Sequence, residues 1–187
     1  MKRFTFSVVF LTLLAGPWAC TQEQAPPAEV PAQTAQESFT VVSSINPLFE
    51  MVKGYIIASA EQIPEDLITY RPTPEVRTFG EILGHVAMTQ YWFCNAAVGE
   101  GPEPENYEEL TAKADLASAV QTAFDHCAAA YAMNDTRAME MVELWGETNT
   151  RLWVLSYNLT HAWEHYGNLV TYMRANGIVP PSSQGGM

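Results

Sequence analysis

The sequence predicts an all-α protein whose helices pack into a bundle. Four segments carry apolar residues at the spacing of an amphipathic helix, whereas no segment shows the sustained alternation of a β-strand. No repeat of about 20 to 50 residues is visible, which excludes solenoid folds. Because an amphipathic helix buries its apolar stripe only against another element, four such helices predict a helical bundle.

The first predicted helix begins at Asn46 and Pro47, an N-cap residue followed by a proline suited to the first helical position. Apolar residues recur at helical spacing from there to Ile63, and Pro64 interrupts the pattern. Residues 65–77 contain two further prolines and no sustained period, so they predict an extended connection.

The second predicted helix has the clearest start signal in the chain. Thr78 and Glu81 stand three positions apart, which is the spacing of a capping box, in which each side chain accepts a hydrogen bond from the backbone amide of the other residue. The helix is expected to run to about Val98, because two glycines and two prolines follow it closely.

The two remaining helices are predicted over residues 110–131 and 149–176, where apolar residues again recur at helical spacing. Gly177 is a suitable residue to end the last and longest helix. Residues 138–146 are ambiguous, because their apolar side chains fit either a short helix or an extended segment.

The composition is that of a globular protein with an acidic surface. Of 187 residues, 48% are hydrophobic and 16% are charged, with 21 acidic against 9 basic side chains and a formal net charge of −12. Such a charge repels a polyanion over most of the surface, so we expect no nucleic-acid partner. Three cysteines are too few for a disulfide scaffold, and the chain is long enough to bury a core without one.

Residues 1–19 have the features of a signal peptide. A basic dipeptide precedes an apolar run over residues 4–15, which is shorter than the roughly 20 residues of a transmembrane helix. A small residue then precedes Cys20, as at the end of a lipoprotein signal, although Pro17 replaces the usual aliphatic residue. We therefore expect export to the periplasm or envelope, with a lipid anchor at Cys20.

Residues 20–38 predict a disordered tether between that anchor and a folded domain over residues 39–187. The segment contains Gln, Ala, Pro and Glu with almost no bulky apolar residue, so burial cannot offset the entropy lost on ordering it. Removal of the leader takes away two basic residues and leaves 7 basic against 21 acidic side chains, a net charge of −14. The mature chain is therefore strongly acidic.

Three histidines form a candidate metal site. His161 and His165 are four positions apart in the last predicted helix, so their side chains leave the same face about 6 Å apart along the axis and can converge on one ion. His85 lies on an apolar side of the second predicted helix, where an unpaired imidazole would be costly. It is a candidate third ligand, since a reactive metal site typically has three protein ligands. The pair lacks the Glu that follows the first His in metalloprotease helices.

A structural role is the alternative for each of these histidines. A histidine pair on an exposed helix face is common, and a half-buried histidine bonds more often to a backbone carbonyl than to a metal. His126, in the third predicted helix, is expected to be an ordinary side chain of that helix. Glu164 could orient a ligand, act as a base or face solvent, and Glu81 has a competing role in the capping box. Neither glutamate is assigned a catalytic role.

Cys94 and Cys127 remain once Cys20 is assigned to the anchor. They could pair between the second and third predicted helices in an oxidising compartment. Free cysteine is also among the most buried residue types, so we expect two buried thiols.

Four motifs resemble the DinB-like proteins, a family of damage-inducible four-helix proteins. They are TPEVRTFGEILGH at residues 73–85, YWFC at residues 91–94, HAWEHYG at residues 161–167 and RANGIVPP at residues 174–181. The resemblance covers about residues 40–183, and its most specific parts are the histidine of the second predicted helix and the HxxxH-Tyr-Gly sequence of the last.

The resemblance implies a four-helix bundle with a long crossover connection and frequently a homodimer. It also implies a site for a divalent transition metal, often zinc or nickel, whose three ligands match His85, His161 and His165. Characterised relatives include thiol-dependent transferases and isomerases and some hydrolase-like members.

Three functional hypotheses follow. The first is an exported, metal-dependent hydrolase or thiol transferase that acts on a small-molecule substrate. The second is a non-catalytic envelope module that binds metal or a small ligand, and the third is a structural or interaction domain. The small thiols used by relatives are cytoplasmic, so export weakens the thiol-transferase hypothesis.

Overall fold

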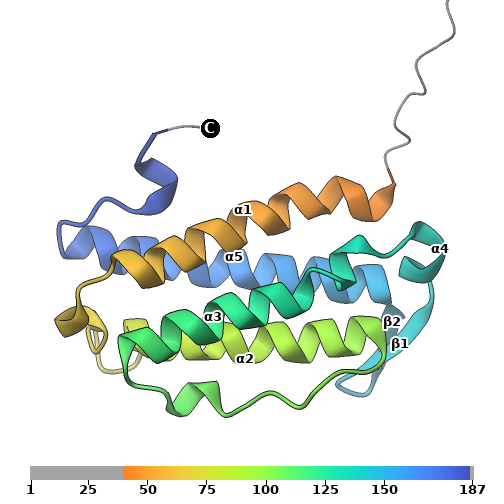
Figure 1. The fold of residues 1–187 in the computed structure, drawn as a ribbon, viewed down its shortest axis with the longest axis horizontal. Coiled ribbons are helices and arrows are strands. Elements are labelled where there is room, and N and C mark those ends of the chain that lie inside the picture. The colour runs from red at the N-terminus through yellow and green to blue at the C-terminus, as the bar shows by residue number, and fades with distance from the viewer. Residues whose placement is uncertain (1–39, 186–187) are drawn as a thin grey trace, which may run out of the picture. The chain divides into compact units, whose positions relative to one another are not determined.

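The computed structural model describes residues 40–185, in which four long helices lie side by side (Figure 1). They are α1 (Val41–Gln62), α2 (Phe79–Val98), α3 (Lys113–Cys127) and α5 (Arg151–Ala175). The predicted all-α bundle is thus confirmed as a mostly helical fold. None of the described helices is both long enough and apolar enough to cross a membrane. The predicted signal peptide, the tether and the anchoring Cys20 lie outside the described residues.

Short elements connect the long helices. They are the 3-10 helices η1 (Glu65–Leu67), η2 (Tyr107–Glu109), η3 (Ala130–Ala132) and η4 (Pro181–Ser183), the single-turn helix α4 (Asp135–Ala138), and the strands β1 (Met141–Leu144) and β2 (Glu147–Thr150).

The start of the first helix was predicted wrongly. Helix α1 begins at Val41, before the predicted start at Asn46, and Thr40 caps it with a capping box, so that Pro47 lies inside the helix. A carboxylate oxygen of Asp135 accepts a hydrogen bond from the backbone amide of Val41 at 2.9 Å. The first turn is therefore stabilised locally, by the capping box of Thr40 and Ser43, and also by Asp135 of α4, which lies far away in the sequence.

Helices α2 and α3 pack in parallel. The Cys94 side chain near the end of α2 bonds to Cys127 at the end of α3. At the other end, Gly80 in the first turn of α2 faces Leu116 in the first turn of α3, where an added Cβ would lie 3.1 Å from the leucine methyl. Because both helices run in the same direction, residues 99–112 must return along the bundle and form its long crossover connection (Figure 1).

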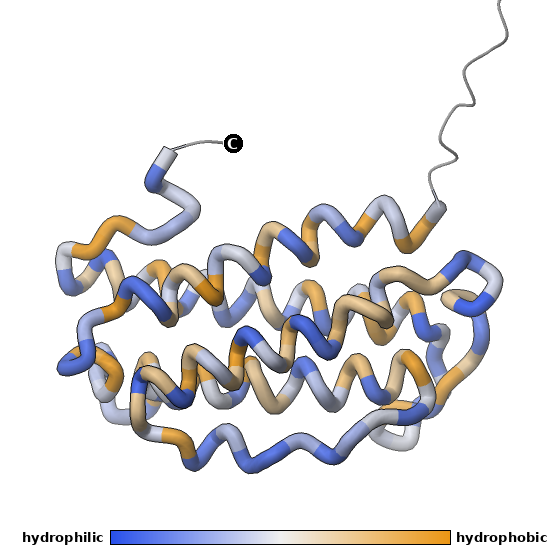
Figure 2. Tube along the Cα trace, in the orientation of Figure 1, coloured by the Kyte–Doolittle hydropathy of each residue, from blue (hydrophilic) through white to orange (hydrophobic). Residues whose placement is uncertain are grey.

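Helices α2 and α5 pack in opposite directions. His85 lies beside His161, and one to two turns further along α2, Gln90 lies beside Asn158. Helix α1 packs against α3 and α5 on the other side of the bundle. Figure 2 shows hydrophobic and hydrophilic residues alternating along each long helix, as expected for helices with one buried stripe.

The ambiguous segment, residues 138–146, holds the last residue of α4 and strand β1, which pairs with β2 in an antiparallel hairpin. The prediction that the chain has no strand was therefore wrong for this short stretch. Strands β1 and β2 are joined by Trp145 and Gly146, which have φ values of 56° and 80°. Two consecutive positive φ angles are typical of a tight turn between antiparallel strands. A tryptophan at such a position is uncommon, and four-residue strands are too short to show a sustained alternation.

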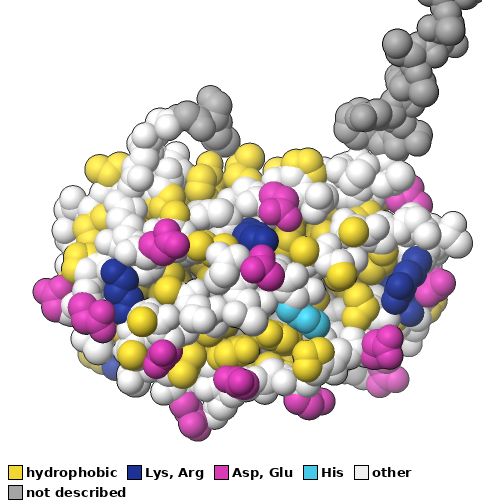
Figure 3. All heavy atoms as spheres, viewed as in Figure 1, with side chains coloured by type: hydrophobic (Ala, Val, Ile, Leu, Met, Phe, Trp, Pro, Cys, Tyr) yellow, Lys and Arg dark blue, Asp and Glu magenta, His cyan; other side chains and the backbone are white. Residues whose placement is uncertain are grey.

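The core is formed by apolar side chains from all four long helices. The largest of those fully buried include Phe49, Phe79, Phe93, Phe124 and Leu155. Over the face drawn in Figure 3, acidic side chains are spread widely and basic side chains are few, which agrees with the net charge of −12.

Cys94 and Cys127 form a disulfide bond, which corrects the prediction of two buried thiols. Their Cα atoms are 5.4 Å apart, within the range that a disulfide requires. Both residues are almost fully buried, at 1% and 0% exposure, so the prediction of burial was right. The pairing depends on the parallel packing of α2 and α3, which local spacing does not reveal.

Reduction of this disulfide is expected to lower the free energy of unfolding by about 3 to 4 kcal/mol. The cause is the entropy that the unfolded chain regains when a link across 33 positions opens. Urea unfolding with and without a reductant measures the difference. The control is the double variant Cys94→Ala, Cys127→Ala, which should unfold at the same urea concentration in both conditions. An unchanged midpoint of the wild type, together with two newly released thiols, would contradict the prediction.

Candidate metal centre

The structure brings the three predicted histidines together at the contact between α2 and α5. Nε2 of His161 lies 3.3 Å from Nε2 of His85 and 3.1 Å from Nε2 of His165. One ring nitrogen from each residue falls within a group whose members are all within 4.8 Å of one another. Separations of about 3.3 Å are those of ligand nitrogens placed tetrahedrally around an ion at about 2.0 to 2.1 Å. The cluster is therefore compatible with a metal ion.

Burial keeps two of these imidazoles neutral. The pKa values of His161 and His165 are both lowered from 6.5 to about 4, mainly because burial penalises the charged form. The neighbouring histidines add to the effect, since a positive charge on one ring disfavours a positive charge on the next. A neutral imidazole whose proton is on Nδ1 presents a lone pair at Nε2, and a cation placed between the three Nε2 atoms could accept all three lone pairs.

Glu108 orients one of the three rings. Its Oε1 lies 2.7 Å from Nδ1 of His85, so a proton on Nδ1 is donated to the carboxylate and the lone pair remains on Nε2. The guanidinium of Arg77 lies 4.0 Å from the same Oε1. Sequence reasoning missed Glu108 because it lies in the crossover, 23 positions after His85, and follows no recognisable spacing.

Gly84 permits this contact. A Cβ at this position would overlap the backbone carbonyl oxygen of Tyr107, so only glycine lets η2 lie this close to α2. Glu108 directly follows Tyr107, and His85 directly follows Gly84. The glycine of the Gly-His pair therefore allows the carboxylate to reach the ring beside it.

The other two rings have no comparable anchor. Nδ1 of His161 and Nδ1 of His165 are buried and have no hydrogen-bond partner among the described residues. Their orientation comes from packing, in which the ring of His161 makes an edge contact with Phe93 at 5.5 Å between centroids. His85 is therefore the only one of the three whose tautomer is set by a carboxylate within the described part of the chain.

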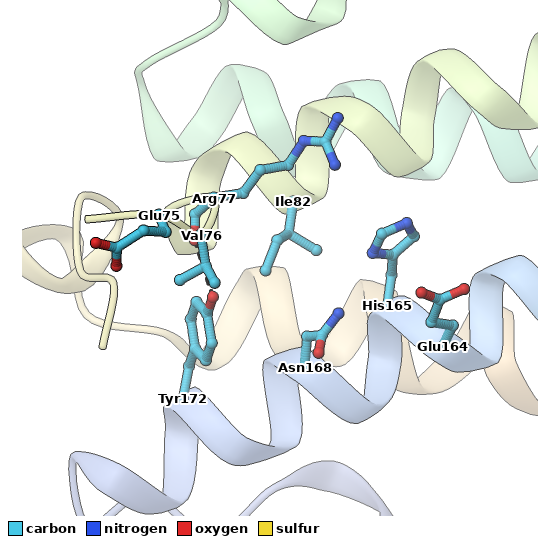
Figure 4. A pocket seen from close by; sticks show the side chains of 8 residues that line it. All are labelled: Glu75, Val76, Arg77, Ile82, Glu164, His165, Asn168 and Tyr172. Carbon is cyan, nitrogen blue, oxygen red and sulfur yellow. Dashed lines mark hydrogen bonds between the residues drawn. The ribbon is translucent and has the colours of Figure 1, made fainter. Parts of the chain in front are cut away.

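A pocket of about 550 Å³ opens beside His165 (Figure 4). Its volume lies in the range of small-molecule sites. The segment before α2, α2 itself and α5 all contribute to its lining, which comprises Glu75, Val76, Arg77, Ile82, Glu164, His165, Asn168 and Tyr172.

The remaining candidate residues have separate positions. Glu164 lines the pocket and is exposed, whereas Glu81 forms the predicted capping box with Thr78. The pKa of Glu81 is lowered, first by the hydrogen bond from the Thr78 backbone amide. His126 lies apart from the cluster, as expected, with Nε2 2.8 Å from Oδ1 of Asn95.

Comparisons with known proteins agree with this fold. The sequence profile of the DinB superfamily matches residues 48–169, which is more than half of the chain. A DinB-like protein from Bacillus cereus is similar at a TM-score of 0.67 and 14% identity, over 76% of this chain and 96% of its own. A DinB-like protein from Bacillus subtilis is similar at a TM-score of 0.62 and 20% identity, over 77% of this chain and 99% of its own. At such identities these structures show a common fold alone. No curated protein matches the chain.

The metal-free protein is expected to lose stability as the pH falls from about 6.5 toward about 4. The folded-state pKa values of His161 and His165 lie below the ordinary value of 6.5. As the pH falls through this range, these two histidines therefore bind protons in the unfolded chain before they do so in the folded chain. The free energy of unfolding should then fall by up to about 1.4 kcal/mol per pH unit for one histidine. Urea unfolding at a series of pH values measures the slope.

The matched control is the double variant His161→Gln, His165→Gln, whose unfolding free energy should depend less on pH over the same range. Equal slopes for the two proteins would contradict the assignment of the pH dependence to these histidines.

Proposed function

Because the chain belongs to the DinB superfamily, we propose that His85, His161 and His165 bind a divalent transition metal, zinc or nickel. The observation that carries the proposal is the convergence of three Nε2 atoms at 3.1 and 3.3 Å. Imidazole is a ligand that suits both ions. Glu108 supports the proposal, because a metal-binding histidine commonly donates its other N–H to a carboxylate.

We further propose that the protein is a metal-dependent hydrolase or thiol-dependent transferase acting on a small molecule. A divalent ion held by three neutral imidazoles keeps its full charge and supplies Lewis acidity, which lowers the pKa of a coordinated water or thiol toward neutrality. The residues of this chain have separate tasks. Glu108 holds the tautomer of His85, while the pocket beside His165 receives the substrate.

Elemental analysis tests the metal site. The wild type is expected to carry about one transition-metal ion per chain, and the double variant His161→Ala, His165→Ala to carry almost none, since a single remaining histidine binds weakly. The variant His126→Ala is the matched control, because it removes a histidine outside the cluster and should keep the metal. All proteins are purified without a histidine tag.

Two results would overturn the metal site. One is an absence of metal in the wild type after incubation with zinc, nickel and manganese. The other is equal metal content in the wild type and the double variant. With metal bound, assays against ester, amide and thiol-conjugation substrates separate an enzyme from a non-catalytic binding module, which would remain inactive in all of them.

We also propose that the protein is exported and anchored through a lipid on Cys20. The basic and apolar leader supports this proposal. The disulfide between Cys94 and Cys127 supports it too, because disulfides persist in oxidising compartments and are rare in the cytosol.

Fractionation of bacteria that produce the full chain tests the proposal. The wild type should lose its leader, carry a lipid and partition with membranes, whereas a Cys20→Ser variant should not be lipidated. A control chain without residues 1–19 should remain in the cytoplasm. An uncleaved wild type in the cytoplasmic fraction would contradict export.

A further inference from the structure

The guanidinium of Arg77 stands over the pocket beside the histidine cluster. Figure 4 shows its side chain extending from the start of α2, past Ile82, toward the side of the pocket on which His165 lies. The side chain is 48% exposed. Its nearest acidic partner, Glu108, is 4.0 Å away, beyond hydrogen-bond distance. No hydrogen bond is found for the guanidinium among the described residues, so its N–H donors are available to a ligand.

The backbone of Arg77 is held in place on both sides. The hydroxyl of Tyr172, on α5, donates a hydrogen bond to the Arg77 carbonyl oxygen at 2.9 Å. The next residue, Thr78, is the N-cap of α2, and its amide donates to Glu81 at 2.7 Å. An arginine on a mobile surface loop would lose more freedom on binding a ligand, so this fixed backbone favours a binding role.

The charges around the pocket limit what it binds. Glu75 and Glu164 line it together with Arg77, so two carboxylates accompany one guanidinium. A ligand with several negative charges would be repelled by both glutamates. A single carboxylate matches the planar fork of arginine and can accept two parallel hydrogen bonds from it. Asn168, which is exposed and also lines the pocket, offers a further amide donor.

We propose that Arg77 binds a carboxylate of the substrate or co-substrate and directs the rest of that molecule toward His85, His161 and His165. The ligand class is a small monocarboxylate whose reacting group lies a short chain away from the carboxylate. This inference rests on the proposed metal site and adds the substrate class to it. Arg77 lies close to the cluster, since Oε1 of Glu108 contacts His85 at 2.7 Å and is 4.0 Å from the Arg77 guanidinium.

The test uses the full chain loaded with cobalt(II), whose absorption reports thiolate binding. The probes are 3-mercaptopropionate, which carries a carboxylate, and 3-mercaptopropionamide, which is its uncharged analogue. The measured quantity is the ratio of the two dissociation constants in each protein. Comparison of that ratio between proteins cancels the intrinsic difference between the two thiols.

The ratio of the amide's dissociation constant to the carboxylate's is expected to be at least about tenfold larger for the wild type than for Arg77→Gln. This is the effect of losing a charge-assisted bidentate contact. Arg77→Lys keeps the charge without the fork and should fall between the two. Arg71→Gln is the matched control, because it removes the same charge from the same segment and does not line the pocket. It should behave like the wild type. Thermal unfolding of every variant verifies that the fold is retained.

The outcomes separate the two proposals. No cobalt bound to the wild type overturns the metal site and this inference with it. Bound cobalt with equal ratios in the wild type and Arg77→Gln overturns the role of Arg77 alone. Tighter binding of 2-mercaptoethanesulfonate than of 3-mercaptopropionate, lost in Arg77→Gln, would overturn the choice of a carboxylate and assign the pocket to a tetrahedral anion.

Discussion

Helix α2 packs against both α3 and α5, and these two contacts fix the positions of the histidine cluster, the disulfide and the crossover. Its antiparallel contact with α5 places His85 beside His161 and His165. Its parallel contact with α3 makes the disulfide possible and requires the long crossover. The crossover then returns along α2 and brings Glu108 to the histidine cluster. One helix therefore positions the candidate ligands, the covalent link and the carboxylate that orients a ligand.

A buried polar layer helps to set the register of α2 and α5. Gln90 and Asn158 are fully buried, and Nδ2 of Asn158 donates to Oε1 of Gln90 at 3.0 Å. The hydroxyl of Tyr131 donates to a backbone carbonyl of α5 at 2.8 Å in the same region. Sliding α5 by one turn would separate these groups in the interior, where an unpaired polar group is costly. The register that joins Gln90 to Asn158 is also the one that aligns the histidines.

The electrostatics of the candidate site differ from those of the whole chain. The chain carries a net charge of −12, and the charged groups beside the cluster are the carboxylates of Glu108 and Glu164 and the guanidinium of Arg77. Burial lowers the pKa values of His161 and His165, so these rings remain available as uncharged donors of lone pairs near neutral pH. Arg77 is the one lysine or arginine among the residues that line the pocket, so attraction of a negatively charged group to the pocket lining comes from its guanidinium.

The helical periods, the capping box of α2 and the common face of His161 and His165 can be predicted from the sequence, because each depends on residues within one or two turns. Assigning His85 as their partner drew on the family resemblance as well as on its apolar position. The hairpin, the disulfide, the contact of Glu108 and the contact of Asp135 with the start of α1 could be seen only in the folded chain. The start of α1 also carries a local signal, the capping box of Thr40 and Ser43. The Asp135 contact, the disulfide and the Glu108 contact each join segments more than twenty residues apart. The hairpin depends on an unusual backbone conformation at Trp145. Local sequence patterns carry no record of which distant groups will meet, because that is decided by how the apolar stripes of the helices pack.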